Sequence, residues 1–95
     1  MFQLEWLPAA KADLERLHAF IRSKSPEAAK KAVLTIIEGV DRLVDFPEMG
    51  SPWEADMNYR ELTIPFGARA YVARYRLFEG RVIIVRIWHG LEDRG

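Results

Sequence analysis

Residues 69–89 read RAYVARYRLFEGRVIIVRIWH, and this stretch decides the fold. It holds two runs rich in Val, Ile and Tyr, residues 69–78 and 81–88, and β-branched and aromatic residues favour strands. Glu79 and Gly80 separate the runs, and a two-residue connection that contains glycine is typical of a tight β-hairpin. The stretch therefore predicts two long antiparallel strands.

The side chains of this hairpin divide between two faces, because successive residues of a strand point in opposite directions. In the first strand the two faces are Tyr71, Ala73, Tyr75 and Leu77 on one side and Val72, Arg74 and Arg76 on the other. In the second strand the same rule sets Ile83, Val85 and Ile87 against Val82, Ile84 and Arg86. We expect one face to pack on helices and the other to hold its guanidinium groups free in solvent, a pattern typical of a half-covered antiparallel sheet.

Two helices are predicted upstream of the hairpin. Residues 8–23 carry one apolar stripe at helical spacing, and residues 26–45 carry another. Ser25-Pro26-Glu27 begins the second helix, because serine caps free N–H groups, proline presets φ, and glutamate suits the positive end of the helix dipole. The short Ser-Lys-Ser connection makes the pair an antiparallel helix hairpin.

Three further segments complete the predicted fold. Residues 2–6 alternate apolar and polar side chains and predict a short strand, residues 47–57 are rich in turn formers and predict a loop, and residues 59–64 predict a strand. The expected order is therefore β-α-α-β-β-β. It describes a single α+β domain over residues 1–95, in which a helix hairpin packs on one face of a mainly antiparallel sheet.

The composition excludes several classes of protein. Ninety-five residues with 49% hydrophobic and 29% charged side chains fit one globular domain. There is no cysteine, and the two histidines, His18 and His89, do not make a convincing metal centre, so we expect neither a metal nor another cofactor. No apolar run approaches the roughly 20 residues of a membrane span, and no secretion signal is visible, so we expect a cytoplasmic protein.

Charge is balanced overall but unevenly divided along the chain. Residues 1–57 carry seven Lys or Arg against ten Asp or Glu, whereas residues 58–95 carry seven Arg against four acids, and the net charge is zero. A neutral protein is a poor general binder of polyanions. The arginines of the second part still allow a local patch that faces phosphate.

The candidate functional side chains lie on or beside the predicted strands. Arginine grips phosphate bidentately and stabilises negative charge in a transition state, and histidine exchanges protons near neutral pH. The simpler alternative is that the arginines form the solvated face of a sheet and that the histidine closes it. Trp53 lies in the predicted loop, and an aromatic ring in such a position either packs over a helix or contacts a partner protein. The candidates are Arg60, Arg69, Arg74, Arg76, Arg81, Arg86, His89 and Trp53.

An ordered set of segments resembles the RelE/ParE toxin superfamily. The segments NYRELTIPFG, YVARYRL and VIIVRIWHGLEDR are similar to the C-terminal half of that superfamily, and AKADLERLHAFI, SPEAAKKAV and LVDFPEMGSP are similar to its helix hairpin and following loop. The resemblance covers about residues 2–94. It implies the same fold and the toxin of a bacterial type II toxin–antitoxin pair, often described as a plasmid stabilisation protein, with a cognate antitoxin as its partner.

The superfamily divides by target. Only some of the functional residues of its members have a counterpart in this sequence. RelE-like members cut mRNA on the translating ribosome with basic residues and, in some members, a histidine near the C-terminus, whereas ParE-like members poison DNA gyrase and lack that set. His89 and Arg60 match the nuclease pattern. Val72 stands where the pattern often has arginine, and Arg69 or Arg74 is the substitute, of which alternation places Arg74 on the same face as Val72. Residues 47–58 contain none of the basic residues that some nucleases use there.

These departures favour a ParE-like toxin that inhibits growth through DNA gyrase. One alternative is a RelE-like, ribosome-dependent mRNA endoribonuclease, and a further one is a non-toxic, stand-alone binding member. The expected partners are the cognate antitoxin and either gyrase or the translating ribosome with its mRNA, with no membrane. The sequence leaves open a homodimer or a hetero-oligomer with the antitoxin. The catalytic residues of the nuclease alternative are Arg60, Arg74 and His89, and the expected target-binding residues are Arg69, Arg76, Arg86 and Trp53.

Overall fold

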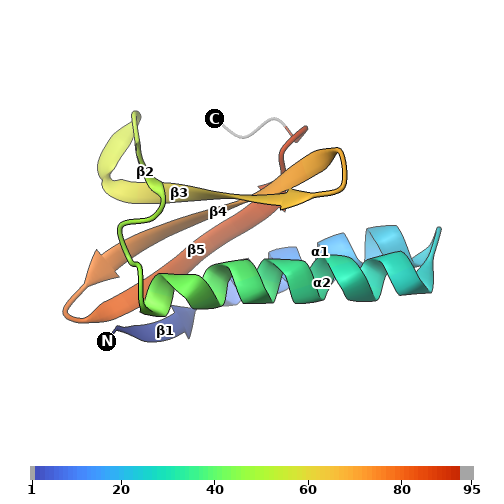
Figure 1. Cartoon of the computed structure of the whole chain (residues 1–95), viewed down its shortest axis with the longest axis horizontal. Helices are drawn as coiled ribbons and strands as arrows, with labels where there is room; N and C mark the ends of the chain where they lie inside the picture. Colours follow the sequence, from blue (N-terminus) through green and yellow to red (C-terminus); the bar gives the residue numbers. More distant parts are fainter. Residues whose placement is uncertain (1, 93–95) are drawn as a thin grey trace.

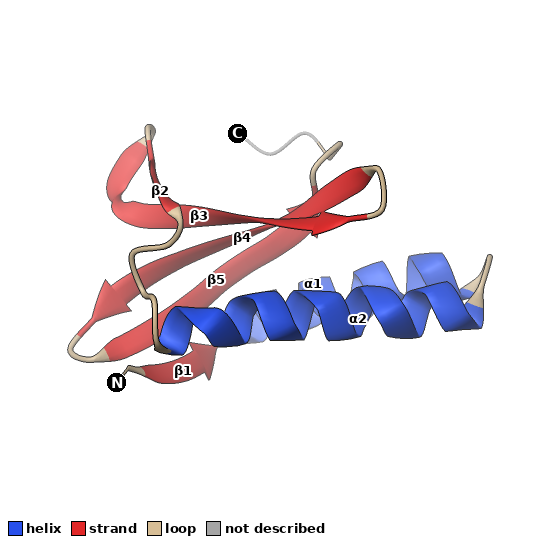
Figure 2. Cartoon of the chain, viewed as in Figure 1, coloured by secondary structure: helices blue, strands red, loops and turns tan. Residues whose placement is uncertain are grey.

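The computed structural model describes residues 2–92, which form two α-helices and a five-stranded sheet (Figure 1 and Figure 2). No helix in this part of the chain is both long and apolar enough to cross a membrane. The elements in chain order are β1 (Gln3–Trp6), α1 (Pro8–Arg22), α2 (Pro26–Asp41), the short 3-10 helix η1 (Arg42–Val44), β2 (Ser51–Trp53), β3 (Asp56–Phe66), β4 (Arg69–Phe78) and β5 (Arg81–His89).

The strands lie side by side in the order β1-β5-β4-β3-β2. β3, β4 and β5 form an antiparallel meander, β2 pairs antiparallel with β3, and β1 pairs parallel with β5 at the opposite edge. Both helices lie on the same side of the sheet, so the other face carries no helix (Figure 1). The predicted α+β fold, with a helix hairpin on one face of a mainly antiparallel sheet, is confirmed.

The hydrophobic core lies between the helix hairpin and the sheet. Small residues let the layers approach closely, and the clearest case is Gly39 of α2, where an added Cβ would lie 3.0 Å from side-chain atoms of Ile64 on β3. The largest fully buried side chains are Tyr75, Ile36, Leu43, Ile84, Ile87, Val40 and Val82. Burial of each large apolar side chain contributes about 1.5–3 kcal/mol, so this layer is the main source of stability.

The helix boundaries follow the signals in the sequence. Ser25 Oγ accepts the backbone N–H of Ala28 at 3.2 Å, and Pro26 opens α2, as predicted. The α-helix ends at Asp41, earlier than the predicted residue 45, because the chain tightens into η1 before the loop.

The segment predicted to be a loop contains a strand. Ser51–Trp53 forms β2 and pairs with β3, and β3 itself begins at Asp56 instead of residue 59. The prolines and the glycine of this segment are typical of loops, but Pro52 is tolerated because β2 lies at the edge of the sheet. The sheet therefore has β2 as a short edge strand in addition to the three C-terminal strands that we expected.

A β-bulge overturns the predicted faces of β5. The pairing with β4 skips Val85, which is the extra residue of the bulge. Ile84 and Ile87 both point into the core as a result, whereas strict alternation placed them on opposite faces. Strict alternation placed Val82 and Ile87 on opposite faces, but both side chains face the helices and are buried.

Candidate functional site

A groove opens between α1 and the end of the sheet where β3, β4 and β5 meet. Its volume is about 890 Å³. Phe20 and Leu91 both line the groove and are 63% and 71% exposed. The apolar lining consists of Leu17, Phe20, Ile21, Phe66, Tyr71 and Leu91.

The rim of the groove carries mostly positive charge. Arg16, Lys24 and Arg69 line it together with His89 and Glu92. The Lys24 ammonium lies 4.6 Å from the centre of the Phe20 ring, a cation–π contact. Within residues 2–92, no carboxylate forms an ion pair with Lys24 or Arg69. The groove therefore combines an apolar floor with two uncompensated cations.

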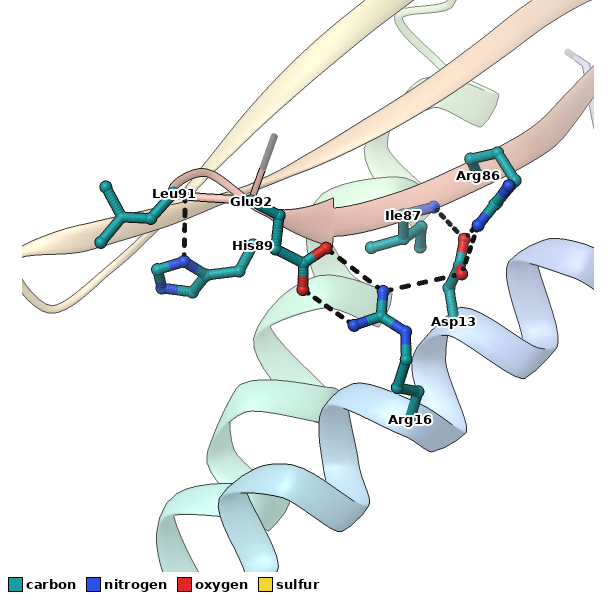
Figure 3. Close-up of polar contacts among 7 residues, drawn as sticks. All are labelled: Asp13, Arg16, Arg86, Ile87, His89, Leu91 and Glu92. Carbon is teal, nitrogen blue, oxygen red and sulfur yellow. Dashed lines mark hydrogen bonds and ion pairs between the residues drawn. The ribbon is translucent and has the colours of Figure 1, made fainter. Parts of the chain in front are cut away.

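Asp13 ties α1 to the edge of β5 beside the groove (Figure 3). Its Oδ2 accepts the backbone N–H of Ile87 at 2.8 Å, and its carboxylate accepts two bonds from the Arg86 guanidinium at 2.7 and 3.0 Å. Burial alone would raise the pKa of Asp13. The hydrogen bonds from Arg86 and Ile87, together with the charges of Arg86 and Arg16, outweigh burial and hold the pKa below its usual 3.8.

A second ion pair holds the turn after β5 against α1. Arg16 donates to both carboxylate oxygens of Glu92, at 2.8 and 3.4 Å, and Leu91 N–H donates to Nδ1 of His89 at 3.1 Å (Figure 3). The His89 ring packs edge-on against Tyr71, with 5.5 Å between the ring centres. Burial, with a smaller contribution from the charge of Glu92, raises the pKa of Tyr71 above 10.0. The phenol is therefore a neutral wall of the groove at physiological pH.

Arg60 lies at the far end of the sheet, beneath the loop that precedes β2. Its guanidinium donates to the carbonyl oxygens of Gly50 and Glu48 at 3.0 and 3.1 Å. The Tyr75 hydroxyl reinforces the same loop, because it donates to the Pro47 carbonyl at 2.7 Å and accepts the Gly50 N–H at 3.0 Å. Arg60 and Tyr75 thus fix the backbone of residues 47–50.

The helix-free face of the sheet carries a stacked arginine. The Arg74 guanidinium lies 3.6 Å from the centre of the Trp53 ring and 4.8 Å from the centre of the Trp88 ring. It also donates twice to Glu61 Oε2, at 2.9 and 3.0 Å. Only 14% of its side chain is exposed. Arg74 therefore connects β2, β3, β4 and β5 across this face.

The stack continues along the same face toward the β4–β5 turn. Trp53 meets Tyr59 edge-on, with 6.3 Å between the ring centres. The Arg76 guanidinium lies 6.0 Å from the centre of the Tyr59 ring and 5.1 Å from that of Phe78. We call this series the ladder, and its members are Trp88, Arg74, Trp53, Tyr59, Arg76 and Phe78.

The three residues of the nuclease alternative are not brought together. His89 pairs with Tyr71 in the register and Arg60 with Tyr75, so the two lie on the strands that flank β4 and are offset by four residues, or about 13 Å along the strand direction at the usual strand rise. Arg74 lies on the opposite face of the sheet. Among residues 2–92 there is also no group of three or more His, Asp or Glu side chains that could hold a metal.

The expectation that the guanidinium groups lie free on the helix-free face is wrong for most of them. Arg74 and Arg86 form ion pairs with Glu61 and Asp13, and Arg60 is held by loop carbonyls. Arg81 pairs with Glu5 at 3.0 Å. The Arg86 guanidinium thus bonds to α1 instead of lying free in solvent. Arg69 and Arg76 form no ion pair within the described chain.

Sequence reasoning missed Phe20, Asp13 and Arg16, and of these only Phe20 has a signal in the sequence. Phe20 lies outside the apolar stripe of α1, and this departure was the available signal for an exposed aromatic rim. Asp13 and Arg16 are common helix-surface residues by type, and their partners Arg86 and Glu92 are 73 and 76 residues away in the sequence. No local pattern links such distant pairs.

Comparisons with known proteins identify relatives along nearly the whole chain. A family model described as "ParE toxin of type II toxin-antitoxin system, parDE" matches residues 4–94. Toxin RelE3 of Caulobacter vibrioides is 35% identical over 94 residues, which are 99% of this chain and 100% of that protein. Toxin RelE1 of the same organism is 40% identical over 85 residues, which are 90% of this chain and 89% of that protein.

A solved structure described as the chromosomal ParDE TA system from P. aeruginosa has a similar fold. It matches with a TM-score of 0.78 and 32% sequence identity, over 94% of this chain and 96% of that one.

Proposed function

Because the chain belongs to the ParE toxin family of type II toxin–antitoxin systems, we propose that it arrests growth by inhibiting DNA gyrase and that a cognate antitoxin neutralises it. The resemblance of the sequence to the RelE/ParE superfamily is confirmed by the family match and by the relatives. Membership gives the role of toxin, and the choice of gyrase as target is the proposal.

The scattered positions of the nuclease residues carry the choice of target. Cleavage of a phosphodiester requires that a proton-transfer group and cationic groups converge within hydrogen-bonding reach of one phosphate. Here His89 lines the groove, Arg60 is engaged by the carbonyls of its loop, and Arg74 is paired with Glu61 on the other face. This arrangement supports a toxin that acts by binding a protein.

The charge of the chain supports the same choice. A protein that attacks mRNA inside the ribosome is surrounded by phosphate and benefits from a large positive charge. This chain has fourteen basic and fourteen acidic residues, and several of its arginines are neutralised by carboxylates within the fold.

Ribosome-dependent mRNA cleavage is the second candidate, and two observations favour it. The curated relatives in Caulobacter vibrioides carry the name RelE, and His89 shares the groove with Arg69 and Lys24. If the groove accepts RNA, these three side chains are the ones that would meet the phosphate.

We infer that the groove receives a segment of the antitoxin. Apolar side chains of an inserted segment would fill the floor formed by Leu17, Phe66 and Tyr71, and its carboxylates would meet Lys24 and Arg69 at the rim. The volume of about 890 Å³ suits several side chains of a peptide. The product of a short open reading frame beside the gene, with a disordered and acidic C-terminal half, is the expected partner.

The proposed function is tested by inducing the chain alone in growing cells and following the incorporation of labelled thymidine and labelled methionine. We expect DNA synthesis to stop first and growth to recover when the adjacent reading frame is induced as well. Immediate arrest of protein synthesis with cleaved mRNA would instead favour the nuclease. Uninterrupted growth would favour a non-toxic member of the family.

A further inference from the structure

The ladder lies on the helix-free face of the sheet, where Trp88 at its inner end is buried and its other members are partly or largely exposed. Four aromatic rings and two guanidinium groups follow one another over the helix-free face, each within 3.6–6.3 Å of the next. At its outer end Phe78 is 43% exposed, and Met57 on β3 is 68% exposed. Both helices lie on the opposite side of the sheet (Figure 1).

The composition of the ladder is that of a protein-binding hot spot. Trp, Tyr, Phe, Met and Arg are the residues that are enriched where proteins recognise one another. The rings are also held in place before any partner arrives, because Arg74 connects Trp53 to Trp88 and its ion pair with Glu61 fixes it in turn. Rigid aromatic side chains lose little conformational entropy on binding.

The charges on this face favour a protein over a nucleic acid. Arg74 is neutralised by Glu61 and Arg81 by Glu5, so Arg76 is the cation of this face that no described carboxylate pairs with. A single-stranded nucleic acid needs a groove of several cations along its backbone besides aromatic rings. One unpaired arginine between two aromatic rings suits a single carboxylate on a folded surface.

We propose that the ladder is the surface with which the toxin binds its protein target, through apolar contacts to Phe78 and Tyr59 and a carboxylate of the target at Arg76. The identification of that target as gyrase rests on the proposed function. The ladder and the groove lie on opposite faces of the sheet, so target binding and antitoxin binding use different residues.

The test compares the purified chain with its Arg76→Glu variant in a supercoiling assay with DNA gyrase. Arg76→Glu is expected to raise the concentration for half-inhibition about tenfold or more, as loss of a hot-spot residue does. Arg22→Glu makes the same change of charge on exposed α1 and is expected to inhibit like the wild type. Phe78→Ser, at a half-exposed position that tolerates a polar residue, is a second ladder variant with the same expected loss.

Inhibition by Arg76→Glu and Phe78→Ser at wild-type concentrations overturns the ladder as the target surface and leaves the choice of gyrase standing. If the wild type does not inhibit gyrase, the proposed target is wrong. The role of the ladder is then tested by measuring growth arrest after induction of the wild type and of the two ladder variants. Relief of arrest by both ladder variants then supports a different protein target, and unchanged arrest overturns the ladder. Binding of a fluorescent oligouridylate that both variants abolish would identify the ladder as a nucleic-acid platform and overturn the proposal.

Discussion

The carboxylate of Asp13 on α1 accepts the backbone N–H of Ile87 on β5 at 2.8 Å, just beyond the point where β1 stops pairing with β5. Trp6 is the last residue of β1, and Leu7 N–H donates to the Ile84 carbonyl as the chain turns into α1. Helix α1 thus supplies a hydrogen-bond acceptor to β5 at the point where β1 no longer pairs with it. One side chain satisfies a buried backbone donor and orients the first helix on the sheet.

We expect Asp13→Asn to reduce the free energy of unfolding by about 2 kcal/mol, because the amide has no charge to pair with Arg86 and has one acceptor oxygen for the three hydrogen bonds that the two carboxylate oxygens receive. Urea unfolding followed by circular dichroism measures this loss. Glu15→Gln, a charge removal at an exposed position of the same helix, is the control and should leave the stability within about 0.5 kcal/mol of wild type.

The Asp13 carboxylate also predicts that the free energy of unfolding falls at acidic pH. The pKa of Asp13 is lower in the folded protein than in the unfolded chain, so its contribution is fully present above about pH 4 and is lost as the pH falls through the folded-state pKa. The stability of the wild type should decline more steeply than that of Asp13→Asn as the pH falls below about 4. Parallel declines of the two proteins would contradict the role given to Asp13.

Tyr75→Phe tests the docking of the loop before β2. The hydroxyl donates to the Pro47 carbonyl and accepts the Gly50 N–H, so its removal leaves two polar groups without their partner and should cost about 1–3 kcal/mol. Thermal unfolding measures the loss. In Tyr59→Phe the deleted hydroxyl makes no hydrogen bond within the described residues, and a similar loss there would show that the loop contacts are not responsible.

Arg69→Glu tests the groove as the antitoxin site. A carboxylate at the rim would repel the acidic segment that we infer, and binding of the product of the adjacent reading frame should weaken about tenfold or more in isothermal titration calorimetry. Arg42→Glu, at an exposed position in η1, is the control for the change of charge. Equal affinities of both variants and wild type would remove the groove from antitoxin binding.

Glu92→Gln is expected to change antitoxin binding while leaving the stability of the fold nearly unchanged. Its ion pair with Arg16 is largely exposed, so the stability should change by less than about 1 kcal/mol. The substitution removes the negative charge of Glu92 from the rim, and Arg16 keeps only its longer ion pair with Asp13, at 3.7 Å, among the contacts described above. We expect antitoxin affinity to rise several-fold at low salt and this gain to shrink as salt screens the charges, whereas weaker binding would mean that Glu92 itself contacts the antitoxin.

Local patterns predicted the secondary structure where a signal lies within a few residues. Ser25 and Pro26 mark the start of α2, and Glu79 and Gly80 adopt φ values of 48° and 76°, as the predicted tight turn requires. The bulge at Val85 could not be predicted, because the run VIIV is apolar throughout and offers no alternation that would reveal a skipped residue.

The sites depend on contacts between distant parts of the chain, which is why they were harder to predict. The sequence identified Trp53, Arg74 and Arg76 as candidate residues, but their arrangement in one ladder depends on β2, a strand hidden among prolines. The groove depends on α1 meeting the end of β5, and Phe20 and Leu91 are 71 residues apart in the sequence, so no local pattern places them together. Residue types thus indicated which side chains to consider, and the topology decided which of them meet.

The most direct test of gyrase as the target is a supercoiling assay with purified gyrase, relaxed plasmid, ATP and either the wild-type chain or its His89→Ala variant. Both proteins should block supercoiling at the same concentration and leave linear DNA after detergent and protease treatment, because the histidine has no part in binding gyrase. Full supercoiling in the presence of excess folded protein, together with mRNA cleavage on ribosomes that His89→Ala abolishes, would contradict the account.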